Sequence, residues 1–209
     1  ISRFFVPKSG MSGPPPVRNR DNILGLPDVP ADHNRELLTA NAIVARTCLL
    51  LTRAIATGTQ FVIENPVDRG DRSLPDAYVN KDHGPIWNMP DIVELSKAAS
   101  ASVVHFPQCM FGSSTQKRTT FMFTSGFDEW FAPLRKMACK HLSHGGMAGG
   151  EQDESGEWNS SATSAYPPDL NLFIAKSIAS LHTGRLTSLV GPATQVAAPD
   201  KPSAPPVQV

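Results

Sequence analysis

The sequence predicts an α/β domain in which helices cover a mostly parallel sheet. Residues 35–57 carry apolar side chains three, four or seven positions apart, which is typical of an amphipathic helix. The apolar run at residues 60–64 follows a helix stop, as a buried strand of a parallel sheet does. A second helical pattern at residues 90–99 leads into another apolar run at residues 102–106. This alternation of helix and strand favours a right-handed crossover connection.

The helix at residues 35–57 has the strongest signals. Asp32 or Asn34 can cap its start, and Gly58 can end it in a left-handed conformation. Its apolar stripe consists of Leu37, Val44, Cys48, Leu51 and Ile55.

The second half of the chain predicts three more elements. Residues 119–124 form a third strand, which can run antiparallel to the others. Residues 127–137 form a short helix, and residues 170–181 return to helical spacing after two prolines.

Length and composition indicate one domain with irregular ends. The chain has 209 residues, and its 19 prolines and 15 glycines are too many for a helical bundle. We expect a Pro/Gly-rich loop segment at residues 1–34, the α/β domain at residues 35–183 and a disordered tail at residues 184–209. Within the domain, residues 145–164 are rich in Gly, Ser and acidic side chains, which predicts a mobile loop.

Charge and hydropathy favour an intracellular protein, nuclear or cytoplasmic. Lys plus Arg equals Asp plus Glu at 19 each, so no strong global field points to an anionic partner. No run approaches 18 uninterrupted apolar residues, and the first ten residues do not resemble a secretion signal, so we expect no membrane partner. Three cysteines without a pairing pattern favour reduced thiols.

Glu64 is the first candidate functional residue, because it directly follows the apolar residues of a buried strand. Loss of hydration there favours the protonated form of a carboxyl group that points into a cleft. Such a group can donate a proton to a ring nitrogen of a bound base, or hold an amine by hydrogen bonds. The alternative is that Glu64 caps a helix or pairs with a surface arginine.

Two motifs resemble a known family. Phe61-Val62-Ile63-Glu64-Asn65-Pro66 resembles the Glu-Asn-Val motif of cytosine-5 DNA methyltransferases, in the Glu-Asn-Pro form of divergent phage, algal and mobile-element members. Cys109-Met110-Phe111-Gly112, followed by Gln116-Lys117-Arg118, is similar to the later Tyr-Gly-x-Pro-Gln-x-Arg-x-Arg segment of that family. The two motifs occur in the order and at the separation that the family shows.

The resemblance implies a partial Rossmann-like methyltransferase layer that acts on DNA with S-adenosyl-L-methionine. Glu64 would be the catalytic acid at the N3 edge of the pyrimidine, and Asn65 would brace the turn or the base edge. Nucleic-acid binding would use the phosphate-holding cations Arg18, Arg20, Lys117 and Arg118, for which solvated loop charges are the alternative.

The sequence also departs from that family. It has no Pro-Cys pair and no cofactor glycines, and Cys48 lies in the middle of an apolar helical stripe, where a thiol is usually an inert small hydrophobe. Because the chain begins with Ile, we interpret it as the carboxyl-terminal portion of a domain whose upstream half is missing, and we expect it to be inactive alone. The alternative is a non-catalytic nucleic-acid or protein binding module. Asn65-Pro66 lacks the second proline of amino-directed methyltransferases, which disfavours that chemistry.

Cys139, His141 and His144 are candidate metal ligands within six residues, and Cys109 is a conceivable fourth. Their spacing is not a common zinc-finger pattern, so a polar loop without metal is the preferred interpretation, and a zinc-stabilised interaction domain is kept as an alternative.

Three large aromatic side chains can be core residues or base-stacking surfaces. We favour the core for Trp87, Trp130 and Phe131, because large aromatics bury area wherever the fold permits.

Overall fold

The centre of the protein is a small antiparallel sheet. The computed structural model describes residues 16–144 and 165–189, with side chains through residue 183. The sheet has three strands in the order β1-β3-β2. Both β1 and β2 pair with β3 in antiparallel fashion, so they point the same way without being neighbours. The strands are β1 (Val62–Pro66), β2 (Ser102–Pro107) and β3 (Arg118–Phe123).

The predicted mostly parallel, Rossmann-like sheet is therefore wrong. The third strand runs antiparallel, as the sequence allowed, but it lies between the other two and removes every parallel pairing from the described sheet. Continuous apolar runs suggested parallel strands because such strands are buried on both faces. Here the apolar residues of the antiparallel sheet are buried on both faces, by the helices that follow β3 on one face and by the cluster of the helices that precede β2 at one end of the other, so the sequence pattern is the same.

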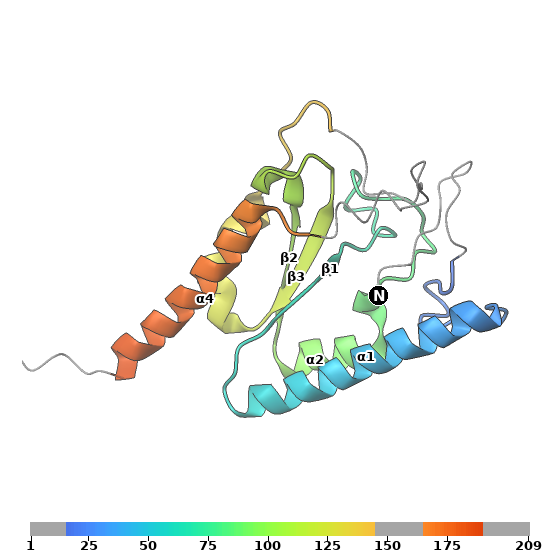
Figure 1. Cartoon of the computed structure of the whole chain (residues 1–209), viewed down its shortest axis with the longest axis horizontal. Coiled ribbons are helices and arrows are strands. Elements are labelled where there is room, and N and C mark those ends of the chain that lie inside the picture. Colours follow the sequence, from blue (N-terminus) through green and yellow to red (C-terminus); the bar gives the residue numbers. More distant parts are fainter. Residues whose placement is uncertain (1–15, 145–164, 190–209) are drawn as a thin grey trace, which may run out of the picture.

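Two groups of helices pack against different parts of the sheet. Figure 1 shows α1 and α2 side by side along one end of the sheet and α4 against the other side. Short 3-10 helices connect the main elements. The α-helices are α1 (Ala31–Ala56), α2 (Pro90–Ala98), α3 (Asp128–Phe131) and α4 (Pro168–Leu189). The 3-10 helices are η1 (Ile86–Asn88), η2 (Gln108–Phe111), η3 (Ser125–Phe127) and η4 (Ala132–Lys136).

The first predicted helix is confirmed, with a different start. α1 begins at Ala31 directly after Pro30, and no side chain caps it, although Asp32 lies in its first turn. Gly58 follows the helix at φ +74°, the left-handed conformation expected of a helix stop. The predicted stripe faces the core, and Leu37, Val44 and Cys48 are buried. Leu51 and Ile55 pack against the buried hydrophobic cluster that contains Val44 and Cys48.

The opposite face of the sheet carries an aromatic core. Phe131 of α3 is fully buried, and its ring centroid lies 4.9 Å from that of Phe123 and 5.1 Å from that of Phe127. Trp130, its neighbour, is 36% exposed. The prediction of a core role thus fits Phe131 and not Trp130. Residues of α4 close this core, including the fully buried Leu170.

Helix ends cross two of the predicted boundaries. α1 begins inside the predicted loop segment 1–34, and α4 continues past residue 183 to Leu189. The predicted loop at residues 145–164 and residues 190–209 of the predicted tail lie outside the described residues.

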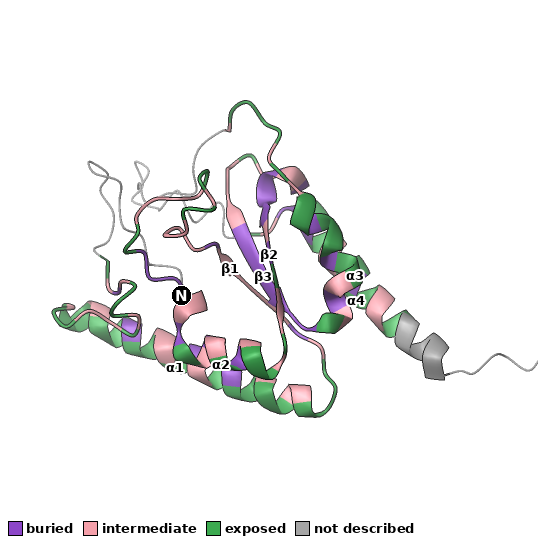
Figure 2. Cartoon of the chain, turned by 180° about the vertical axis from the view of Figure 1, so that it is seen from behind, coloured by how far each residue is buried: buried purple, intermediate pink, exposed green. Residues whose placement is uncertain are grey.

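The outer side of α1 is apolar and exposed. Leu38 is 59% exposed and Leu50 67%, and Figure 2 shows exposed residues along much of the helix. By length and composition α1 could cross a membrane, but core helices of globular proteins pass the same test. One side of α1 packs on the core, so length and composition alone do not establish a span.

Candidate functional site

Glu64 lies on β1 with its side chain on the α4 face of the sheet. It pairs with Phe121 of β3, which belongs to the aromatic core on that face. Glu64 Oε2 accepts a hydrogen bond of 2.8 Å from the hydroxyl group of Tyr166. Glu64 Oε1 is buried and has no hydrogen-bond partner within the described part of the chain. The carboxyl group is therefore held on one oxygen and left with unused acceptor capacity on the other.

Tyr166 is placed by the turn that starts α4. Pro167 and Pro168 follow it, and Pro168 is the first residue of the helix. Burial, the negative charge of Glu64 and the hydrogen bond to Glu64 together raise the pKa of Tyr166 well above its ordinary value of 10.0. The phenol therefore stays protonated and acts as the donor. Lys117 lies beside it, with Nζ 5.8 Å from the centre of the Tyr166 ring.

Asn65 lies on the opposite face of the sheet from Glu64, because successive strand residues alternate. It pairs with Thr120, which in turn pairs with His105 of β2. His105 Nδ1 lies 2.8 Å from Thr120 Oγ1. Burial lowers the pKa of His105, and this effect is larger than those of the nearby charges of Asp71, Arg118 and Asp68. The two residues predicted as catalytic, Glu64 and Asn65, therefore do not meet on one face.

Arg118 also lies on the face away from Glu64. It is three residues from Phe121, the residue opposite Glu64, so strand alternation directs it to the other face. Its Nε donates a hydrogen bond of 2.6 Å to Asp76 Oδ2, and its Nη2 forms an ion pair with the same oxygen. Of the two basic residues in the second motif, Lys117 is the one near the Glu64 and Tyr166 pair.

Arg18 has a structural role. Its guanidinium is buried, donating to Asn41 Oδ1 at 2.8 Å and to the sulfur of Met89 at 3.3 Å. Burial lowers its pKa to about 10. Because Asn41 also donates to the carbonyl oxygen of Leu24 at 2.7 Å, the pair holds the segment before α1 against that helix. A side chain used in this way is poorly placed to hold a phosphate.

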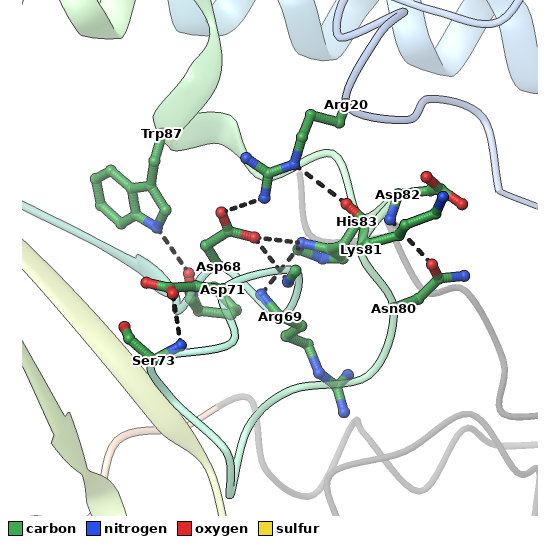
Figure 3. A network of polar contacts seen from close by, with 12 residues as sticks. Arg20, Asp68, Arg69, Asp71, Ser73, Asn80, Lys81, Asp82, His83 and Trp87 are labelled. Atoms are coloured by element: carbon green, nitrogen blue, oxygen red, sulfur yellow. Dashed lines mark hydrogen bonds and ion pairs between the residues drawn. The ribbon is translucent and has the colours of Figure 1, made fainter.

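Arg20, from the segment before α1, reaches a polar network in the loop between β1 and η1 (Figure 3). Its Nη2 lies 2.6 Å from Asp68 Oδ2, and its Nε donates to the Lys81 carbonyl oxygen at 3.2 Å. His83, a buried residue, contributes Nδ1 at 3.3 Å from Asp68 Oδ1 and at 3.3 Å from the Arg69 amide nitrogen. Nδ1 can accept from the amide or donate to the carboxylate, but not both at once.

Sequence reasoning missed Asp68 and His83. Burial alone would raise the pKa of Asp68, but hydrogen bonds from His83, the Gly70 amide and Arg20 outweigh it and lower that pKa. The two residues are 15 positions apart and match no motif. Only the fold of the loop brings them together, so no sequence signal could have found them.

The four candidate metal ligands lie together. One atom each from Cys109, Cys139, His141 and His144 lies within 4.8 Å of every other. Cys139 Sγ is 3.5 Å from Cys109 Sγ, 3.5 Å from His141 Nδ1 and 3.2 Å from His144 Nε2. Burial, with help from Cys139, raises the pKa of the Cys109 thiol to about 11. The sequence favoured a polar loop without metal, and the structure brings the cysteine and two histidines of that loop together with Cys109.

Cys48 and Trp87 have core roles. Cys48 is buried in α1, and burial, followed by the negative charge of Asp91, raises the pKa of its thiol to about 11. This supports the reading of Cys48 as an inert hydrophobe. Trp87 packs against the hydrophobic cluster that contains Cys48, and its indole nitrogen donates to the Pro66 carbonyl oxygen at 2.8 Å. That bond fastens η1 to the end of β1 (Figure 3).

Comparisons with family models, curated proteins and solved structures find no match to this chain.

Proposed function

We propose that the chain binds a target cytosine base through Glu64, the function that its resemblance to cytosine-5 DNA methyltransferases implies. The observation that carries the proposal is the state of the carboxyl group. Tyr166 holds Oε2, while the buried Oε1 has no partner among the described residues. A buried acceptor without a partner costs free energy, and a ligand N–H group can recover it.

Cytosine offers the matching chemistry. Its exocyclic amine can donate to the carboxylate, and its N3 can accept a proton when the carboxyl group is protonated. Tyr166 is a positioning residue here, because its hydrogen bond fixes the carboxyl group without touching the base. Solvent does not reach Oε1, so base binding includes a movement of Glu64 or Tyr166.

The proposal assigns base binding to this chain and leaves methyl transfer outside it. Transfer by this chemistry needs a thiolate that adds to the ring, and a site for S-adenosyl-L-methionine. The sequence has no Pro-Cys pair, and Cys48 is a buried thiol of raised pKa. The chain would thus contribute to the base pocket without supplying the nucleophile.

A binding experiment tests the proposal. Fluorescence anisotropy would compare a labelled duplex carrying one cytosine opposite an abasic site with the same duplex carrying thymine there. We expect the native chain to prefer cytosine about tenfold, the value of one good hydrogen bond. Glu64→Gln should abolish this preference, while Glu94→Gln, which changes an exposed glutamate of α2, should keep it. Equal binding of both duplexes by the native chain, or an unchanged preference in Glu64→Gln, would contradict the proposal.

A second candidate is a non-catalytic binding module, favoured by the state of the arginines. Arg18, Arg20 and Arg118 all make contacts within the chain. DNA affinity without base preference, or none at all, in the same experiment would favour this candidate.

A further inference from the structure

We propose that Cys109, Cys139, His141 and His144 bind one zinc ion in a closed tetrahedral centre. The proposal is independent of the base-binding function, because the cluster lies on other segments than Glu64. It rests on four side chains of metal-binding type that converge from two parts of the chain.

The distances fit a tetrahedral ion. Zinc binds sulfur at about 2.3 Å and imidazole nitrogen at about 2.0–2.1 Å, so ligand atoms in a tetrahedron lie about 3.4–3.8 Å apart. Cys139 Sγ lies 3.2–3.5 Å from an atom of each of the other three residues. All pairs of ligand atoms fall within 4.8 Å, so a small inward adjustment of side chains closes the site.

The donor set selects the metal. Two thiolates and two imidazoles in a tetrahedral arrangement favour zinc over calcium or magnesium, which prefer oxygen ligands. Four protein ligands leave no open position for water or substrate, so the centre is structural.

The positions of the four residues show which segments a zinc ion would join. Cys109 lies in η2, directly after β2, and is buried. The other three ligands follow η4, which packs against β2. The two ends of the loop that contains Cys109 are joined by a backbone hydrogen bond of 2.9 Å, from the Gln108 N–H group to the Lys117 carbonyl oxygen, just before β3 begins. A zinc ion would therefore tie the connection between β2 and β3 to the segment that follows η4.

Metal analysis of the full chain tests the proposal. The protein, purified under reducing conditions and incubated with zinc, should retain about one equivalent after removal of free metal. Replacement by cobalt should give the visible absorption of a tetrahedral thiolate site. Cys139→Ala and His144→Ala should weaken zinc binding more than about 100-fold. Loss of a residue that only supports a metal ligand costs up to about 100-fold, so loss of a ligand itself should cost more.

Matched controls separate ligand loss from general damage. Cys48→Ala changes a buried cysteine in another core cluster, and His182→Ala changes an exposed histidine of α4, so both should retain full zinc binding. Should Cys139→Ala fail to fold, the stoichiometry and cobalt spectrum of the native chain still decide. Zinc content well below one equivalent, octahedral cobalt, or a disulfide between Cys109 and Cys139 in place of metal would overturn the proposal.

Discussion

The hydroxyl group of Tyr166 lies 2.8 Å from Glu64 Oε2 and joins two residues 102 positions apart. This contact connects the start of α4 with an edge strand of the sheet. It fixes one carboxylate oxygen and leaves the other free of partners among the described residues. The base-binding proposal depends on this difference in hydrogen bonding between the two carboxylate oxygens.

Removal of the Tyr166 hydroxyl should destabilise the protein by about 1–2 kcal/mol, because Tyr166→Phe leaves both carboxylate oxygens without a donor. A double-mutant cycle with Glu64→Ala, measured by urea unfolding, should give a coupling of about 1 kcal/mol. Additive effects of the two substitutions would mean that the contact contributes nothing to stability.

Stability should fall at acid pH partly because of Asp68. Its pKa is lowered in the folded protein, so its contribution is present above the unfolded value and is lost as the pH falls through the folded value. Urea unfolding between about pH 5 and pH 3 should show a smaller loss for Asp68→Asn than for the native chain. Asp28→Asn, a change at an exposed aspartate, should follow the native profile.

Phe131 should be far more important for stability than its neighbour. Phe131→Ala removes a fully buried ring and should cost about 3–5 kcal/mol, whereas Trp130→Ala, at a partly exposed side chain, should cost about 1–2 kcal/mol. Chemical denaturation of both variants measures the difference. Similar losses for the two would contradict the placement of Phe131 in the core.

Gly58 should tolerate asparagine better than alanine. A Cβ at this position meets no atom within 4 Å, so only the φ of +74° opposes a side chain. Gly58→Ala should cost about 1 kcal/mol and lower Tm by about 2–4 °C, and Gly58→Asn should cost less, because asparagine adopts this conformation more readily. An equal Tm for all three proteins would show that the helix ends differently.

Local periodicity predicted the positions of the helices and strands well, but it did not predict how the strands pair. The stripe on α1 and the spacing within α2 depend on neighbours three and four positions away, which the sequence displays directly. Strand order depends on which strands exchange hydrogen bonds. Nothing in Phe121 or Met122 shows that β3 lies between the other two strands, because an apolar strand looks the same in either direction.

The candidate site was predictable residue by residue but not as an arrangement. Glu64 was singled out from its place after an apolar run, yet nothing in the sequence showed that Tyr166, far along the chain, would be its hydrogen-bond partner. The candidate metal ligands at residues 139–144 were visible as a cluster, but only the fold shows that Cys109, a conceivable fourth, lies beside them. Arg118 was assigned to phosphate from its motif, and its contact with Asp76 required the loop structure.

The most direct test of base binding is the 15N NMR spectrum of an oligonucleotide with one 15N-labelled cytosine opposite an abasic site. On addition of the native chain, we expect the N4 or N3 resonance of that cytosine to shift, and the shift to disappear with Glu64→Gln while it persists with Glu94→Gln. Resonances that do not move, or that move equally with Glu64→Gln, would contradict the claim that the Glu64 carboxyl group receives the base.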